Sequence, residues 1–393
     1  MSETQKHTKP NVPNLRFPGF EGEWERKQLS VCCEIYDGTH QTPKYTKTGI
    51  PFVSVEDITA LRTIEKKFIS EDNYKRDFKI APQAGDILMT RIGDIGTSRV
   101  VTDNSPLAYY VSLALLRPIG IEASFLNSYI PSPYFKRELY RRTIHVAFPQ
   151  KINKEDIGKC LFAHPSIDEQ SKIGSFLSLL DQRIDTQSKL IEDLRILKKA
   201  IMARLFQSSD GEMKTLGELT VNFSNRNKQR IPYPMFSVTN DKGFIPQSEQ
   251  FEDREMEGED IAAYKLIQAG DIAYNPARIN VGSIAQYKGK TTCMISSLYV
   301  CIQARRTVSD RWLMHILKSE RLLYYYNLYA EGGVRLYLFY PNFSRIKVFV
   351  PPYAKQERIA DCLDAIEKKV EQEFVLLNDL MKQKKFFLSR LFL

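Results

Sequence analysis

Apolar residues recur at alternating steps of four and three along two stretches of the chain, 165–206 and 351–392. In the first stretch they are Ile173, Leu177, Leu180, Ile184, Ile191, Leu194, Ile201 and Leu205. This spacing is a heptad pattern, and it predicts an α-helix with one apolar stripe. Each stretch has about forty residues, so we expect two helices roughly 60 Å long.

The two stretches are copies of one another, because a constant offset of 186 residues aligns them without a gap. The residues that recur unchanged are Pro165, Gln170, Ile173, Leu177, Leu190, Asp193, Leu194, Lys198, Lys199, Arg204, Leu205 and Phe206. Polar residues interrupt the seam at the same steps, Gln187 and Lys198 in one copy, Glu373 and Lys384 in the other. Shared interruptions favour a shared seam, so we predict an antiparallel coiled coil and a pseudo-twofold relation between the two halves. The alternative is two independent helices, each packed on its own globular half.

A region of short strands and loops precedes each long helix, which predicts the order body, helix, body, helix. Gln83–Ile87 in the first body match Gln268–Ile272 in the second, although the bodies otherwise differ widely. We expect one further helix around Ser132–Thr143 and its counterpart near Trp312–Tyr329. The prediction is an α+β fold with two mixed α/β domains and two long helices. The boundaries are a disordered tail at 1–14, domains at 15–164 and 208–350, and long helices at 165–207 and 351–393.

Composition narrows the class of protein. The chain has 393 residues, more than one ordinary core needs, and a net charge of +9, which favours a polyanionic partner. No apolar run approaches the roughly twenty residues of a membrane span, and the polar start has no signal peptide, so we expect a cytoplasmic protein. The six cysteines form no CxxC pair and are interpreted as incidental thiols of a reducing compartment.

Motifs for catalysis are incomplete. Gly289–Thr291 ends like a phosphate-binding loop, but Ile284 stands where the first glycine must be. Val350–Tyr353 is similar to the Asn-Pro-Pro-Tyr site of amino-methyltransferases, but Val350 cannot hold an amine. The histidines are scattered along the chain. The sequence therefore predicts no catalytic residue, no metal ligand and no cofactor bound by this chain.

Several loops combine glycine with amide, hydroxyl or basic side chains, which are the groups that address base edges and phosphates. Arg91 could contact guanine with two hydrogen bonds, and Arg278 stands at the matching position of the second body. For each loop alone, the alternative is an ordinary surface turn. The candidate DNA-binding residues are Thr39, His40, Gln41, Thr42, Lys44, Arg91, Thr239, Asn240, Lys242, Arg278, Asn280, Ser283 and Arg335.

The chain resembles the specificity (S) subunit of type I restriction-modification enzymes. The resemblance rests on the body–helix order, the LRFPGFEGEW opening, the helix entry Pro165–Gln170, the Arg-Leu-Phe helix ends and the loops DGTHQTP and NPARINVGSI. In the second copy Lys355 replaces Glu169 at the helix entry. The resemblance covers essentially the full length.

The family resemblance implies that each body is a target-recognition domain for one half of a bipartite, asymmetric site in double-stranded DNA. The helices would act as a ruler between the halves. The subunit would be non-catalytic and would assemble with two modification (M) subunits, which bind S-adenosylmethionine and methylate adenine, and two restriction (R) subunits, which use ATP and Mg²⁺. The alternatives are a stand-alone DNA-binding protein such as an orphan regulator, an enzyme fused into this chain, and a coiled-coil scaffold.

Overall fold

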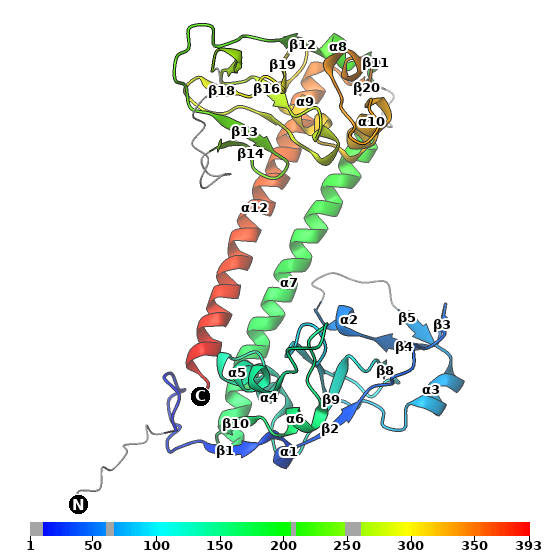
Figure 1. Ribbon diagram of the computed structural model, residues 1–393, viewed down its shortest axis with the longest axis vertical. Coiled ribbons are helices and arrows are strands. Elements are labelled where there is room, and N and C mark those ends of the chain that lie inside the picture. Colours follow the sequence, from blue (N-terminus) through cyan, green and yellow to red (C-terminus); the bar gives the residue numbers. More distant parts are fainter. Residues whose placement is uncertain (1–10, 60–66, 206–209, 248–260) are drawn as a thin grey trace, which may run out of the picture. The chain divides into compact units, whose positions relative to one another are not determined.

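The computed structural model describes residues 11–59, 67–205, 210–247 and 261–393 (Figure 1). It divides into two compact units, Met1–Glu192 with Gln372–Leu393, and Asp193–Glu371. Each unit therefore contains one body and a part of both long helices. Over the described residues, no helix combines the length and apolar character that crossing a membrane requires.

The predicted disordered tail, 1–14, extends too far along the chain. Residues 1–10 lie outside the described part of the chain, but residues 11–14 are packed. The amide of Trp24 donates to the carbonyl of Asn11 at 2.8 Å, and Pro13 is buried. Leu15 donates its amide to the carbonyl of Arg390 at 2.9 Å. These backbone bonds fix the segment in a way that its polar composition does not reveal.

Unit 1 is built on two four-stranded sheets and one strand pair. The first sheet is antiparallel, in the order β2-β9-β6-β7, and its central strands are buried apolar runs. The second sheet has the order β3-β5-β4-β8, with β4 and β8 parallel. The strands are β1 (Glu25–Gln28), β2 (Cys33–Asp37), β3 (Tyr45–Thr46), β4 (Ile50–Val53), β5 (Lys67–Ile69), β6 (Ile87–Thr90), β7 (Ser98–Val100), β8 (Ala108–Tyr109), β9 (Leu113–Pro118) and β10 (Leu161–His164), where β1 pairs with β10.

Unit 1 also contains six short helices among its described residues. They are α1 (Leu29–Cys32), α2 (Val55–Thr59), α3 (Glu71–Asp77), α4 (Ala123–Tyr129), α5 (Pro133–Arg142) and α6 (Lys154–Gly158). The predicted helix around Ser132–Thr143 is α5. It begins where it does because the Ser132 hydroxyl accepts from the amide of Phe135 at 3.3 Å, which caps the helix.

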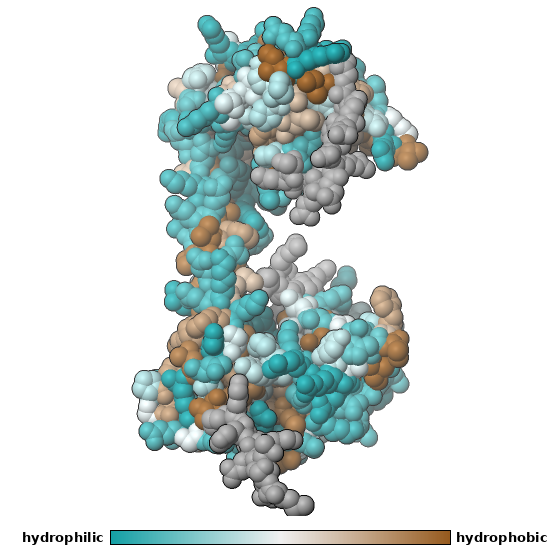
Figure 2. All heavy atoms as spheres, turned by 60° about the vertical axis from the view of Figure 1, so that its left-hand side comes forward, coloured by the Kyte–Doolittle hydropathy of each residue, from teal (hydrophilic) through white to brown (hydrophobic). Residues whose placement is uncertain are grey.

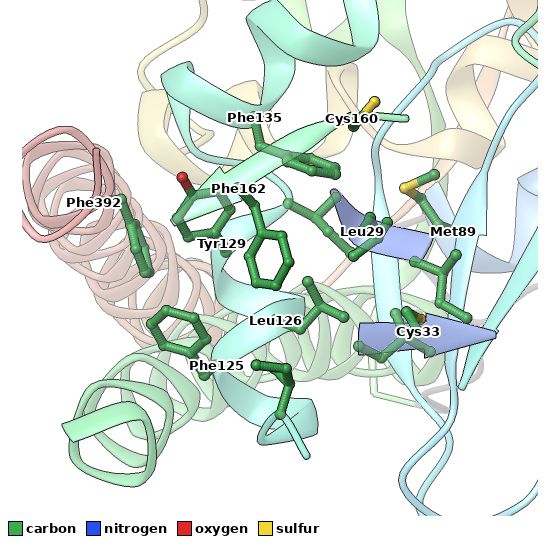
Figure 3. Packing of buried hydrophobic residues seen from close by; sticks show 14 of the residues in the cluster. Leu29, Cys33, Met89, Phe125, Leu126, Tyr129, Phe135, Cys160, Phe162 and Phe392 are labelled. Atoms are coloured by element: carbon green, nitrogen blue, oxygen red, sulfur yellow. The ribbon is translucent and has the colours of Figure 1, made fainter. Parts of the chain in front are cut away.

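The core of unit 1 also takes up the end of the second long helix, α12 (Tyr353–Arg390), and the residues that follow it. Phe392 packs against Phe125 and Tyr129, with ring centroids 5.7 Å and 5.0 Å away (Figure 3). The hydroxyl of Tyr129 donates to the carbonyl of Leu393 at 2.7 Å. The aromatic side chain in the repeated Arg-Leu-Phe motif is therefore a core residue here.

Unit 2 repeats this plan with a sheet of the order β12-β19-β16-β17, again antiparallel. The strands are β11 (Glu212–Thr215), β12 (Thr220–Phe223), β13 (Phe236–Thr239), β14 (Gly243–Pro246), β15 (Lys265–Ile267), β16 (Ile272–Tyr274), β17 (Ile284–Gln286), β18 (Cys293–Ile295), β19 (Val300–Ala304) and β20 (Lys347–Val350). Three further pairs form, β11 with β20, β13 with β14 and β15 with β18. The helices are α8 (Leu216–Leu219), η2 (Ile261–Ala263), η3 (Ile279–Val281), α9 (Asp310–Leu317), α10 (Glu320–Tyr329) and α11 (Tyr340–Phe343).

One helix that the sequence predicts near Trp312–Tyr329 is two helices, α9 and α10. The chain breaks because the hydroxyl of Ser319 accepts from the amide of Leu322 at 3.3 Å and caps a new helix. Tyr326 is fully buried, whereas Tyr324 is largely exposed.

The repeated Gln-Ala-Gly-Asp-Ile motif makes the same turn in both units. The carboxylate of Asp86 accepts from the amide of Gln83 at 2.8 Å, and that of Asp271 accepts from Gln268 at 2.8 Å. The glycine within each turn has a φ of 92° or 93°, in the left-handed region that glycine adopts most easily. The motif therefore shapes the entry into β6 and β16.

The long helices α7 (Ile167–Leu205) and α12 are both present and pair within each unit (Figure 1). In unit 1, Leu180 and Ile184 of α7 pack against Leu380 of α12. At the predicted polar step the amide of the buried Gln187 donates to the backbone carbonyl of Glu373 at 3.0 Å, and its side chain also contacts the Glu373 carboxylate. The seam is thus shared, polar interruption included.

Ion pairs between the two long helices show that the helices are antiparallel. In unit 1 Lys384 pairs with Asp181, and in unit 2 Lys198 pairs with Glu367. The offset of 186 relates these two pairs, so both units use the same contact with the roles of the helices exchanged. Rising numbers on one helix meet falling numbers on the other. The predicted antiparallel coiled coil within an α+β fold is confirmed, rather than two independent helices.

A buried glutamine anchors α7 to the body of unit 1. Gln170 accepts from the amide of Glu122, at the start of α4, at 3.0 Å, and donates to the carbonyl of Pro165 at 2.9 Å. Its neighbour Glu169 is fully buried and binds the guanidinium of Arg16 through both oxygens, at 2.8 and 2.7 Å. The helix entry therefore locks the helix, the body and the opening segment together.

Unit 2 keeps the glutamine anchor and changes its neighbour. Gln356 accepts from the amide of Ser309, at the start of α9, at 2.8 Å, and donates to the carbonyl of Pro351 at 2.9 Å. Lys355 pairs with Asp210 at 3.5 Å. The departure at Lys355 thus exchanges one ion pair for another and leaves the anchor intact.

Candidate nucleic-acid interface

The first candidate loop of unit 1 leaves β2 through a tight passage. A side chain on Gly38 would place its Cβ 2.5 Å from the carbonyl oxygens of Tyr109 and Tyr110, so glycine is required there. Thr39 donates its amide to Tyr109 at 3.2 Å and is half-buried. The backbone is therefore fixed up to Thr39, and beyond it the loop presents four exposed side chains, His40, Gln41, Thr42 and Lys44.

The side chain of Arg91 is buried, although its place in a glycine-containing loop suggests an exposed side chain. The side chain forms an ion pair with Asp37, at the end of β2, while the Arg91 amide donates to Ser112 at 2.9 Å. The Tyr109 hydroxyl donates to the Asp37 carbonyl at 3.2 Å, and burial, followed by the charge of Asp37, raises the pKa of Tyr109. Arg91 thus joins two candidate loops, and a contact with a base requires this ion pair to open.

A third loop, 144–151, completes the group in unit 1. The amide of Gly93 donates to the carbonyl of Gln150 at 2.8 Å, and that of Ile152 donates to Arg91 at 3.0 Å. The amide of Ile144 closes the loop on Lys151 at 2.7 Å. The sequence analysis missed this loop, although the constant offset aligns it with the segment around Arg335.

In unit 2 the hairpin β13–β14 supplies the first candidate loop. The Thr239 hydroxyl donates to the Gly243 carbonyl at 3.2 Å and accepts from the amide of Lys242 at 3.2 Å, so Thr239 shapes the turn. Lys242 itself is exposed. The buried hydroxyl of Ser283 donates to the Val238 carbonyl at 2.7 Å and ties the hairpin to the next loop.

The segment 276–283 lies against that hairpin. Asn240, exposed at the hairpin tip, is close enough to Gly282 that a Cβ added there would lie 3.7 Å from the Asn240 Cβ. Arg278 is exposed, whereas Arg91 is buried. The predicted correspondence of the two arginines is wrong by two residues, because Pro276 takes the place of Arg91: its carbonyl accepts from Leu338 as that of Arg91 accepts from Ile152. The Asn280 amide donates to the side chain of Asn327 at 2.9 Å. Arg278 and Asn240 are therefore the more accessible candidates.

Arg335 belongs to the third loop of unit 2. The amide of Leu338 donates to the carbonyl of Pro276 at 2.9 Å, which holds this loop beside the segment 276–283. Arg335 is exposed. In each unit the candidate residues therefore meet in one group of three loops, in which Arg91 and Ser283 are structural connections and the exposed side chains are available to a ligand.

One set of side chains in the described part of the chain has metal-ligand spacing, His315, Asp364 and Glu367. The Nε2 of His315 lies 2.8 Å from an oxygen of Asp364, and its Nδ1 lies 3.7 Å from Glu367. Both carboxylates already have cationic partners, Arg311 at 3.0 Å from Asp364, and Lys198 beside Glu367. We interpret the set as an ion-pair network that fastens α9 to the long helices.

Comparison with known proteins gives a consistent result. The sequence profile described as "Type I restriction modification DNA specificity domain" matches residues 21–195. The protein named "Putative type I restriction enzyme MjaX specificity subunit" of Methanocaldococcus jannaschii is 25% identical over 427 aligned residues, covering 98% of this chain and 97% of that protein.

Solved structures share the fold. A crystal structure of the S subunit of a type-I restriction-modification system from M. genitalium superposes with a TM-score of 0.61 at 16% identity, covering 97% of this chain and 99% of that one. A structure described as the basis of complex assembly and conformational transition of the type I R-M system has a TM-score of 0.50 at 16% identity, covering 96% and 98%.

Proposed function

Because this chain belongs to the specificity-subunit family of type I restriction-modification enzymes, we propose that its two bodies read the two halves of a bipartite, asymmetric DNA site. One observation carries the proposal. Each unit gathers three polar loops, and two of the three, 91–96 with 144–151 in unit 1 and 276–283 with 331–337 in unit 2, follow corresponding elements, yet the exposed side chains differ between units. A common frame with different readers fits a target whose halves differ in sequence.

The exposed side chains divide into base readers and phosphate contacts by their chemistry. In unit 1, Gln41 can bond adenine with two hydrogen bonds, and Lys44 suits a phosphate. In unit 2, Asn240 can likewise form two hydrogen bonds with adenine, and Arg278 and Arg335 suit guanine or a phosphate. The proposal assigns this chain a binding role and leaves the chemistry to partner subunits.

Loop variants in the complex reconstituted with modification subunits test the assignment. We expect Gln41→Ala to relax the base preference in one half-site and Arg278→Ala in the other, each by about 1–3 kcal/mol or roughly 5–150-fold. Lys159→Ala, at an exposed position directly after α6 and outside the loops, is the control. If both loop variants alter the same half-site, or neither alters any, the assignment of one half to each body is wrong.

The proposal extends to partners. Two M subunits would bind S-adenosylmethionine and methylate adenine, and two R subunits would use ATP and Mg²⁺ to cut unmodified DNA. A surface for an M subunit lies on the helix pair of unit 1, where Phe176, Leu179, Leu376 and Phe387 line an apolar groove. Leu179 and Leu376 remain 60% and 43% exposed, and Figure 2 shows hydrophobic side chains among the polar ones along the helices.

Co-purification tests the docking surface. We expect Leu179→Asp combined with Leu376→Asp to abolish recovery of the M subunit, because a charge in the apolar contact must be desolvated without a partner. Lys382→Asp, at an exposed position outside the groove, should leave recovery unchanged. Undiminished recovery with the double variant would place the docking surface elsewhere. A DNA-binding protein that works alone would recover no M subunit in any form.

A further inference from the structure

Large apolar side chains are displayed almost completely to solvent at only three described positions, and all three lie in two corresponding loops. Val146 and Phe148 are 98% and 103% exposed, and Val334 is 104% exposed. The next most exposed apolar side chain described, Leu298, reaches 75%. The loop with Val146 and Phe148 connects α5 to α6, and the loop with Val334 connects α10 to α11, which are the corresponding connections of the two units. Each unit therefore holds an apolar side chain outward at the same place of its fold.

These loops are closed by hydrogen bonds, so the exposure is built into the fold. In unit 1 the amide of Ile144 donates to the carbonyl of Lys151 at 2.7 Å. In unit 2 Glu331 and Tyr337 exchange two backbone bonds, at 2.9 and 2.8 Å. An apolar side chain gains by leaving water, and a closed loop that holds it outward prevents it from folding back onto the body.

Both loops are attached to the loops that carry the candidate DNA-binding residues. In unit 1 the bonds from Gly93 to Gln150 and from Ile152 to Arg91 make this connection, at 2.8 and 3.0 Å. In unit 2 the bond from Leu338 to Pro276 makes it, at 2.9 Å. A nucleic acid bound to those loops would meet the apolar tips.

The surroundings of the tips indicate the kind of ligand. The loop 144–151 contains no acidic residue, and it ends in the exposed Lys151. The loop 331–337 carries the exposed Arg335 directly after Val334, and its one acid, Glu331, stands at the base of the loop. A stable protein interface needs on the order of 800 Å² per partner, whereas one or two apolar side chains on a narrow loop that carries a cation suit insertion between stacked bases.

We propose that Phe148 and Val334 act as wedges that enter the DNA duplex beside the bases read by each body and partly unstack one base step. This inference rests on the proposed function, because it requires DNA at these loops. The free energy needed to unstack a base step depends on its sequence. Steps that unstack easily, TA and CA/TG, are therefore favoured at the two insertion points. Phe148, the larger side chain, opens its step more than Val334 does. The wedges thereby add specificity at positions without a hydrogen bond to a base.

The test uses the complex with modification subunits and a duplex carrying its methylated motif, with 2-aminopurine placed in turn at each step of both half-sites. Wild-type complex should raise the fluorescence at one step per half-site, because the probe brightens when it unstacks. Phe148→Ser should remove the rise in one half-site only and weaken binding about tenfold, which equals about 1.4 kcal/mol. Val334→Ser should do the same in the other half-site. Phe148→Leu, which keeps an apolar wedge, should retain most of the signal.

The outcomes separate the two proposals. A complex that methylates no defined motif refutes the proposed function itself. A complex that methylates its motif but shows no fluorescence rise, or whose Phe148→Ser variant binds as wild type does, refutes the wedge alone. If Phe148→Ser instead loses the modification subunit, the loop is a protein contact and the wedge is overturned. Unchanged Trp24 fluorescence of the chain alone, in a Trp312→Phe background, confirms that each unit 1 variant is folded.

Discussion

Removal of the buried glutamine at a helix entry should loosen one unit and spare the other. Gln170 is 2% exposed and uses both ends of its amide, accepting from Glu122 and donating to Pro165. Gln170→Ala leaves the Glu122 amide without its hydrogen bond in a place that water reaches poorly, and it removes one of the two partners of the Pro165 carbonyl, the other being His164 Nδ1 at 3.2 Å. At about 1–3 kcal/mol for the unsatisfied amide and about 1 kcal/mol for the second lost hydrogen bond, we expect the free energy of unfolding of unit 1 to fall by about 2–4 kcal/mol.

The two tryptophans allow each unit to be followed separately. Trp24 is buried in the core of unit 1 and Trp312 in the core of unit 2. Urea unfolding of Gln170→Ala is therefore measured by Trp24 fluorescence in a Trp312→Phe background. Gln356→Ala, measured through Trp312 in a Trp24→Phe background, should show a loss of similar size because its two hydrogen bonds are equivalent.

The control is Gln182→Ala, which removes the same amide from an exposed position on α7. It should change the unfolding free energy by less than about 0.5 kcal/mol. If Gln170→Ala is no more destabilising than Gln182→Ala, the buried anchor contributes nothing. The account of how each body is fastened to its helix would then be wrong.

Three further predictions concern other parts of the chain. Iodoacetamide at pH 8 should label Cys362 alone in the native protein, as measured by mass spectrometry, because the other five cysteines are buried. Burial raises the thiol pKa to about 11 at Cys293 and to about 12 at Cys33, Cys160 and Cys301. Labelling of a buried thiol at the rate of Cys362 would contradict the packing. Gly38→Ala should lower the melting temperature of unit 1, because its Cβ meets two carbonyl oxygens at 2.5 Å, whereas Gly333→Ala, with open space around it, should not; equal melting temperatures would refute the tight passage. Four residues added to each long helix, about 6 Å, should lengthen the unread spacer by one or two base pairs in the methylated motif, and an unchanged spacer would argue against the ruler.

The sequence was sufficient for the long helices, because their apolar period and their duplication report directly on one shared seam. The ion pairs Lys198–Glu367 and Lys384–Asp181 illustrate this, since the repeat offset relates them. The turn in Gln-Ala-Gly-Asp-Ile was similarly predictable as a corresponding feature, because its geometry depends on residues within the motif.

The environment of the candidate site was less predictable, because it depends on residues distant in the chain. The burial of Arg91 follows from Asp37, which lies 54 residues earlier, and composition gives no sign of their pairing. The break between α9 and α10 depends on whether Ser319 caps a helix or lies within one, a choice that packing decides. The loop around Phe148 could have been found by carrying the repeat offset from Val334 back into the first body.

The most direct test of the account is a genome-wide map of adenine methylation in a host that expresses this chain with its modification subunits and has no other adenine methylation. Two different readers on a fixed frame predict one motif with two unlike halves, separated by a spacer of constant length and arbitrary sequence. Exchange of the second body, 208–350, for the corresponding body of a similar specificity subunit should replace one half of the methylated motif and preserve the other half. A contiguous motif, or an exchange that rewrites both halves, would contradict the claim that each body reads its own part of the target.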